Sequence, residues 1–217
     1  MRKSAFYFAA VLIFISASRV SGEVTVDSRS LNIKERGRIN EFIGDVVIKG
    51  RGFSVFSERA LSDTETGVIT AEGNVDINYS SGTFSLDTRS LRARIDDGKK
   101  KFYLSGEVRS LYTSDEAPPV LIYSDSVEIS YSEPRRALFE GSVRTESGEL
   151  EITSREAFYR EDYERIDFTG DPEAWSDSEE GRVHYRGDLI RVYVQDEKIS
   201  IEGRARTRVW LEDEPGM

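Results

Sequence analysis

Apolar and polar residues alternate along most of the chain from residue 23 onward, in short runs separated by Gly, Asp, Asn and Ser. Alternation is the period of a β-strand, whose successive side chains point to opposite faces. An amphipathic helix would instead repeat apolar residues at intervals of three and four, and no part of this region does so. The pattern therefore predicts an all-β protein of antiparallel strands joined by turns.

A Gly-x-Val element recurs along the chain. It is clearest at Gly44, Gly73, Gly106 and Gly141, and it is weaker at Gly170 and Gly203. The first two and the last two intervals between these glycines match in length, which predicts two duplicated halves. We expect the glycines where the backbone needs a positive φ or where another segment leaves no room for a side chain.

A second element precedes each glycine and reads apolar-x-apolar-x-small-x-x-apolar, as in Phe53, Val55, Ser57 and Ala60. In a regular strand, the step of three after the small residue would turn the apolar side chains to the opposite face. A bulge or corner at that point lets one long strand continue into a second sheet around the same interior. The sequence thus predicts six strand pairs in two facing antiparallel sheets.

The two elements together predict which apolar side chains point inward. We call this set the inward stripe, and it comprises Phe42, Val46, Ile48, Phe53, Val55, Ala71, Val75, Ile77, Phe84, Leu86, Leu104, Val108, Ile122, Phe139, Val143, Ile152, Phe168 and Ile201. Charged residues occupy the positions between them. One interruption, at residues 113–119, contains Pro118 and Pro119, and it predicts a loop inside one continuous domain.

Residues 1–22 have the features of a cleaved signal peptide. Arg2 and Lys3 precede an apolar run at 5–17, and small residues follow as far as Gly22. The run is shorter than the roughly 20 residues that a spanning helix needs. We expect residues 23–217 to form a single exported domain, with an uncleaved membrane anchor as the alternative. The chain has no cysteine, so its fold must hold without disulfides.

Charge excludes one class of partner. The whole chain has a formal net charge of −10. Removing residues 1–22, which carry three basic residues and no acidic one, would shift this charge to −13. Nucleic-acid binding requires clustered Lys and Arg, so we expect no nucleic-acid partner. An amphiphilic partner should make contact through its apolar part.

The sequence shows no catalytic, metal or cofactor motif. Its one histidine, His184, lies between Val183 and Tyr185 and is expected to be a solvated surface residue. The GxSxG and Walker-type patterns are absent, and the acidic stretch at 177–181 is better explained as a hairpin turn than as a calcium loop. We therefore expect a protein that is not an enzyme and needs no cofactor.

Several motifs resemble the OstA-like family, and in particular its LptA-type periplasmic members. They are "FIGDVVI" at 42–48, "AEGNVDI" at 71–77 and "YRGDLIRVYV" at 185–194. A further feature of the family corresponds to "GDPEAW" at 170–175 and "IEGRARTRV" at 201–209. The resemblance covers about residues 24–210, and its specificity lies in the order and spacing of the motifs.

The resemblance implies a β-jellyroll shaped like an open clamp, whose inward stripe holds the acyl chains of lipopolysaccharide. It also implies a periplasmic bridge formed with LptC-type and LptD-type OstA-like domains. In such a bridge, the terminal strands expected at 24–33 and 199–210 would accept another chain by edge-strand addition, or a second copy head to tail.

Three alternatives remain open at the level of sequence. The first is an LptC-like, membrane-anchored protein of the same fold. The second is a structural envelope protein with a dry core, because a dry core and a lipid groove have the same apolar pattern. The third is a β-solenoid enzyme acting on polysaccharide, which the single histidine disfavours.

Overall fold

The computed structural model describes residues 24–50, 52–81, 84–114, 118–178, 181–193 and 198–211. The predicted signal peptide lies outside these residues. The strands are β1 (Thr25–Asp27), β2 (Ser30–Lys34), β3 (Ile39–Gly50), β4 (Phe53–Asp63), β5 (Val68–Ser81), β6 (Phe84–Asp96), β7 (Lys101–Ser114), β8 (Val120–Ser130), β9 (Arg136–Ser147), β10 (Leu150–Arg160), β11 (Arg165–Thr169), β12 (Glu173–Ser178), β13 (Gly181–Arg186), β14 (Leu189–Tyr193), β15 (Lys198–Glu202) and β16 (Arg206–Leu211). Two short 3₁₀ turns are η1 (Glu35–Gly37) and η2 (Glu161–Tyr163).

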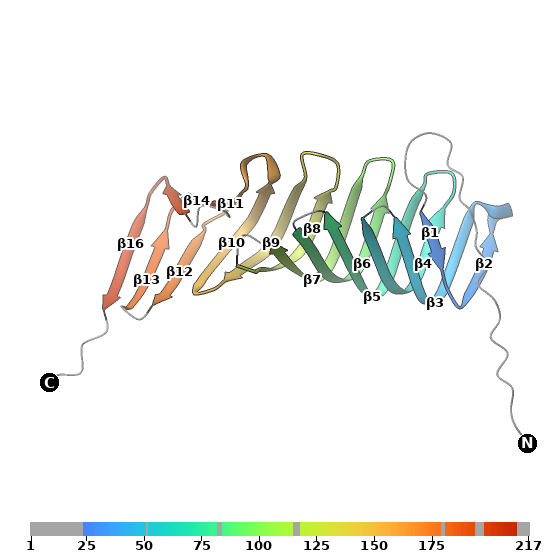
Figure 1. Ribbon diagram of the computed structural model, residues 1–217, viewed down its shortest axis with the longest axis horizontal. Coiled ribbons are helices and arrows are strands. Elements are labelled where there is room, and N and C mark those ends of the chain that lie inside the picture. The colour runs from blue at the N-terminus through green and yellow to red at the C-terminus, as the bar shows by residue number, and fades with distance from the viewer. Residues whose placement is uncertain are drawn as a thin grey trace, which may run out of the picture.

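All of these strands belong to one antiparallel sheet. The main path runs β1-β3-β4-β5-β6-β7-β8-β9-β10-β11-β14-β15, with β2 beside β3 and with β12, β13 and β16 joined through β10. Figure 1 shows an elongated body with β2 near one end and β16 at the other. The all-β prediction is confirmed. The long strands pass through both facing layers, as the predicted corners imply, and the two layers are therefore parts of one continuous sheet.

The bends lie where the sequence predicted them. The pairing register shifts between Ile43 and Val46 in β3, and corresponding shifts interrupt each later pair as far as β9 with β10. At every Gly-x-Val site the glycine has a positive φ, for example 80° at Gly44 and 79° at Gly73. The residue after it is also left-handed at Asp45 and Asn74. The extra residue turns the strand through a corner, which confirms the predicted need for glycine.

The small residue of the second sequence element is often a serine, and this serine lies at a corner of its strand, where it bonds to the backbone. The hydroxyls of Ser57, Ser124 and Ser154 each donate to the backbone carbonyl two residues further on. Ser90 makes the same bond in β6, where the sequence pattern had indicated Thr88. The bond satisfies a carbonyl at a point where the ladder is interrupted. A small hydroxyl residue therefore recurs at the corners.

The corners divide the sheet into two arms. Arm A comprises β1, β12, β13, β16 and residues 46–50, 53–56, 75–81, 84–89, 108–114, 120–123, 143–147 and 150–154. Arm B comprises β2, β11, β14, β15 and residues 39–43, 59–63, 68–72, 92–96, 101–105, 126–130, 136–140 and 156–160. Beyond β10 the arms share no further described strand, since β12 continues one and β11 the other.

The inward stripe forms the space between the arms. Nearly all of its members are buried, and Val55, Ala71 and Val75 are 0% exposed. Leu86 and Ile201 are only half-buried, and the side chain of Phe84 lies outside the described residues. The copy of the second sequence element that begins at Phe84 ends at Leu91, and the element predicts that Leu91 points inward. This prediction is wrong, because Leu91 is 52% exposed. It covers the corner at Gly106, while Ser90 and Ala93 face the core.

The two ends of the sheet are single strands broken by a corner. The expected strand at 24–33 is divided into β1 on arm A and β2 on arm B. The expected strand at 199–210 is likewise divided into β15 on arm B and β16 on arm A. Each end of the described sheet therefore presents two strand edges, one on each arm.

Candidate functional site

The candidate site is the space between the arms, on the side away from the corners. We call this space the trough and its open side the mouth. At the N-terminal end aromatic rings close the mouth. Phe53 of arm A contacts Phe102 of arm B edge to face, with ring centroids 5.0 Å apart, and it also meets Tyr131 at 5.9 Å. Further along, Tyr112 of arm A faces Tyr159 of arm B at 6.2 Å.

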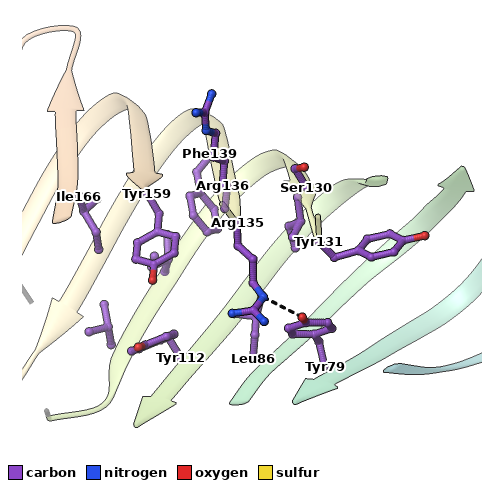
Figure 2. Close-up of a pocket in the computed structure, with 14 residues that line it drawn as sticks. Tyr79, Leu86, Tyr112, Ser130, Tyr131, Arg135, Arg136, Phe139, Tyr159 and Ile166 are labelled. Carbon is purple, nitrogen blue, oxygen red and sulfur yellow. Dashed lines mark hydrogen bonds between the residues drawn. The ribbon is translucent and has the colours of Figure 1, made fainter. Parts of the chain in front are cut away.

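A first cavity of about 50 Å³ lies inside the mouth near the middle of the sheet. Its lining comprises Tyr79, Leu86, Tyr112, Val120, Ile122, Ile129, Ser130, Tyr131, Arg135, Arg136, Ala137, Phe139, Tyr159 and Ile166. Figure 2 shows Tyr112 and Tyr159 on opposite sides of this space. The wall that faces this space is apolar, which suits hydrocarbon.

A second, larger cavity of about 260 Å³ continues toward the C-terminal end. It is lined by Pro118, Val120, Thr145, Ser147, Leu150, Ile152, Ile166, Phe168, Ser176, Val192, Tyr193 and Ile199. Val120 and Ile166 line both cavities, so the two hollows adjoin. Leu150, Val192 and Ile199 are only half-buried, which leaves apolar surface within reach of solvent at this end.

Electrostatics set the trough apart from the rest of the acidic chain. Among the described residues that line the two cavities there is no carboxylate, and the charged groups are Arg135 and Arg136. Burial raises the pKa of the Tyr159 hydroxyl. Burial and a hydrogen bond to Asp97 raise the pKa of Tyr131. Both phenols therefore remain neutral hydrogen-bonding groups at physiological pH.

Arg135 reaches across the mouth. It belongs to the connection between β8 and β9, beside arm B, and its Nε donates to the Tyr79 hydroxyl of arm A at 2.9 Å. Figure 2 shows this bond and shows Arg136 pointing the other way. Glu161 accepts from the Arg135 backbone N–H at 2.7 Å and also pairs with its guanidinium. A turn carboxylate thus holds the arginine over the trough.

The structure divides the inward stripe into two groups. Leu86, Ile122 and Phe139 line the first cavity, and Ile152 and Phe168 line the second. The other members whose side chains are described line neither cavity, and those nearer the N-terminal end, such as Ile48 and Val55, are fully enclosed. The stripe therefore forms a solid core in the N-terminal half of the sheet and the wall of the two cavities in the other half.

Sequence reasoning found Phe53 but missed the tyrosines and the arginine that form the mouth. Tyr79 continues the alternation of Val75 and Ile77, so extending the stripe by one step would have found it. The same extension from Val108 leads to Tyr112. Arg135 could not have been found this way, because it lies in a turn without periodicity and its contact with Tyr79 depends on how the arms close.

His184 differs from its expected state. The ring lies parallel to Trp175, with centroids 3.8 Å apart, and its Nε2 is 3.2 Å from a Glu173 oxygen. Its side chain is 15% exposed, so the prediction of a solvated imidazole is wrong. It lies on the outer face of arm A, away from the trough. No cluster of three or more potential metal ligands occurs among the described residues, and no helix described there is long and apolar enough to cross a bilayer.

No family model matches the sequence, and no curated protein matches it. Among solved structures the chain is similar to LptH from Pseudomonas aeruginosa, described as the LptA-homologous periplasmic component of the lipopolysaccharide transport device. The two sequences are 12% identical, and the comparison covers 88% of this chain and 95% of that chain with a TM-score of 0.25.

Proposed function

We propose that this protein is a periplasmic carrier that holds the acyl chains of lipopolysaccharide in the trough and passes the lipid from the inner to the outer membrane. The observation that carries the proposal is the hollow, carboxylate-free, apolar space between the arms, which remains accessible at its C-terminal end. The OstA-like sequence motifs support the same function. A protein with only a structural role would gain stability by filling this space.

The size of the space bears on how it is used. The larger cavity, about 260 Å³, is below the 300–1,000 Å³ of typical ligand pockets. A lipid with several acyl chains therefore requires the arms to move apart. The contacts across the mouth are between side chains, and they include the Tyr112–Tyr159 ring contact and the hydrogen bond from Arg135 to Tyr79. On the opposite side the continuous backbone of the long strands joins the arms at the corners. Opening about the corners would expose the apolar wall. Each methylene of an acyl chain that is then buried against this wall would contribute about 0.8 kcal/mol to binding.

The partners proposed are LptC-type and LptD-type OstA-like domains, with a head-to-tail homo-oligomer as a further possibility. In the described sheet β1 and β2 have a neighbour on one side only, and so do β15 and β16. These four strands contain no proline. Main-chain bonding along such edges would align the troughs of successive domains into one continuous path.

Photo-crosslinking in the native envelope tests the proposed function. A photoreactive residue at Ile152 or Val192, in the wall of the larger cavity, should trap lipopolysaccharide. The matched control is Glu151, the neighbour of Ile152 that pairs with Trp175 on the outer face of arm A. Crosslinks to lipid at Glu151 but at neither wall position would refute the proposal. Ile77 and Leu104 are less suitable sites because both lie in the enclosed core.

A structural envelope protein is the second candidate function. The observation in its favour is the solid packing of the N-terminal half, where Ile48 and Val55 are 0% exposed. Under this alternative, lipopolysaccharide would not co-purify with the protein from its native envelope. The membrane-anchored alternative is tested separately by the mass of the mature N-terminus, since cleavage near Gly22 would exclude an anchor.

A further inference from the structure

Arg135 is a cation at the boundary of an apolar space. Its side chain is 17% exposed, and it lines the first cavity together with four tyrosines and a set of aliphatic residues. Bringing a guanidinium into such surroundings costs free energy unless it has partners. Arg136, the other charged lining residue, points away to the outer side of the mouth (Figure 2). Arg135 is therefore the charged group that an occupant of the trough would meet first.

The partners of Arg135 are unequal in strength. Glu161 binds the backbone N–H and one side of the guanidinium, and Glu133 lies 3.6 Å from another nitrogen. The Nε donates instead to the neutral hydroxyl of Tyr79, on the opposite arm. Hydrogen bonds to charged acceptors are roughly twice as strong as neutral ones. An anionic oxygen that entered the mouth would thus replace the tyrosine hydroxyl at a gain, while Glu161 kept the arginine in place.

We propose that Arg135 is a headgroup site, which exchanges Tyr79 for an anionic oxygen group, such as a phosphate, on an amphiphile whose hydrocarbon body occupies the trough. This inference rests on the proposed lipid-carrying function and deepens it by naming the charge and the position of the headgroup. Arginine suits this task because its planar fork of donors matches phosphate and carboxylate geometry. The exchange also breaks a hydrogen bond between the arms, so headgroup binding and opening of the mouth are coupled.

The chemistry of the two rims places the headgroup on arm B. On this arm Arg136, Arg160 and Arg165 lie in register at the mouth-side ends of β9, β10 and β11. Asp167 pairs with Arg160 at 3.3 Å and with Arg165 at 3.0 Å, and it offsets part of this charge. The facing ends of β8, β9 and β10 on arm A are Val120, Ser147 and Leu150, which carry no charge. An anionic group therefore finds cationic donors on arm B alone.

Calorimetric titration of the full mature chain tests the headgroup site with three probes, of which the two amphiphiles are kept below their critical micellar concentrations. Lauroyl-lysophosphatidic acid has both the chain and the phosphate, monolaurin has the chain without the phosphate, and glycerol 3-phosphate has the phosphate without the chain. We expect the phosphorylated amphiphile to bind about tenfold more tightly than monolaurin, because one hydrogen bond to a charged group is worth about that factor. Glycerol 3-phosphate alone should bind far more weakly than either amphiphile.

Two substitutions should change this preference in opposite directions. The quantity compared is the dissociation constant of monolaurin divided by that of lauroyl-lysophosphatidic acid. Arg135→Gln should bring this ratio to about one, because the charged donor is lost. Tyr79→Phe should raise the ratio above that of the parent, since the headgroup no longer displaces a hydroxyl from Arg135. Arg89→Gln is the matched control, because it removes an exposed cation paired with Asp76 on the outer face of arm A. It should leave the ratio as in the parent.

Each outcome decides between the hypotheses. Equal binding of both amphiphiles by the parent, or an unchanged ratio in Tyr79→Phe, would overturn the headgroup site and leave the carrier function standing. Failure of both amphiphiles to bind would overturn the carrier function and the headgroup site together. Tight binding of glycerol 3-phosphate alone would show a site for free phosphate and not for an amphiphile. If Arg135→Gln does not fold, the Tyr79→Phe result decides.

Discussion

At the residue scale, the corner glycines connect the sequence repeat to the shape of the molecule. Gly141 has a φ of 73°, and the Cβ that any other residue adds would lie 2.9 Å from the Cβ of Asp125. Two separate costs therefore act at this position, one from the backbone conformation and one from the contact. Gly67, in the turn between β4 and β5, has a similar φ of 69° and no atom within 4 Å of an added Cβ.

Comparing alanine at these two positions separates the two costs. We expect Gly141→Ala to lower the free energy of unfolding by about 1–3 kcal/mol, with Gly67→Ala near the lower limit because it has backbone strain alone. Chemical denaturation with a two-state fit would measure both values. Equal losses of unfolding free energy in the two variants would show that the contact with Asp125 relaxes without cost. If both variants kept the parent's free energy of unfolding, the positive φ would be incidental.

A buried carboxylate in arm B links stability to acid. Glu41 is 6% exposed, and its oxygens accept from Lys34 at 2.7 Å and from Arg59 and Asn32. The hydrogen bonds from Lys34, Arg59 and Asn32, in this order, lower the pKa of Glu41 to about 2. An acid whose pKa is depressed on folding stabilises the protein above its unfolded pKa of about 4.3, and it loses this effect as the pH falls through the folded value.

Glu41→Gln should therefore lower the melting temperature at pH 6 and make little difference near pH 2, with the two curves converging between about pH 4.3 and 2. Thermal melts followed by circular dichroism across this range would measure the effect. Glu164→Gln, at an exposed turn position, controls for the loss of one surface carboxylate. Parallel curves for the parent and Glu41→Gln down to pH 2 would contradict the assignment.

At the element scale, the edges of the sheet determine what it can join. Ala205, once expected to lie within the C-terminal edge strand, lies in the turn before β16, and its N–H bonds to the carbonyl of Gly203. The residues that test this edge are therefore Thr207 and Arg208, which pair with Tyr185 and His184 of β13. In an antiparallel pair, neighbouring residues direct their N–H groups to opposite sides of the strand.

One of the two N–H groups faces away from β13, toward the open edge, and the other bonds to β13. Proline at the first position would remove a donor of the open edge, and proline at the second would remove a hydrogen bond within the sheet. We expect one of Thr207→Pro and Arg208→Pro to abolish concentration-dependent oligomers in light scattering while the circular dichroism stays that of the parent. Oligomers that persist in two folded variants would show that β16 is not the junction.

How far the sequence could predict the elements depends on which forces decide them. The corners at Gly44, Gly73 and Gly141 could be predicted because positive φ restricts the residue type locally. The inward stripe could be predicted because burial follows the strand period. The division into a solid and a hollow half could not, because it depends on how far two arms approach each other, and the same alternation occurs in both halves. The duplicated halves remain a prediction from spacing.

At the scale of the whole molecule, strand length changes from one end to the other. The strands from β3 to β10 have 11 to 14 residues and pass through both arms, whereas β11 to β16 have five or six and belong to one arm each. Shorter ladders without a shared strand open at a lower free energy. The second cavity, whose lining extends to β12, β14 and β15, thus reaches into the part of the sheet with less support.

Amide hydrogen exchange should follow this division. We expect faster exchange in β12 to β16 than in β4 to β9, and slower exchange in β12 to β16 when lauroyl-lysophosphatidic acid is bound, because an occupant would cover Val192 and Ile199. Mass spectrometry of peptic fragments would measure both effects. Uniform protection along the chain would show that the arms beyond β10 are held as firmly as the rest.

The placement of the first and last strands at opposite ends of one sheet also has a mechanical consequence. Hydrogen bonds between neighbouring strands run along the long axis of the body, and β2 and β16 lie near its two ends (Figure 1). A pulling force between these strands would act along the hydrogen bonds and would peel one ladder after another, because the bonds nearest the pulled end break first. The molecule would therefore yield one ladder at a time under tension. Under the proposed function, a span between two membranes that is built from such units would part under load without tearing either membrane.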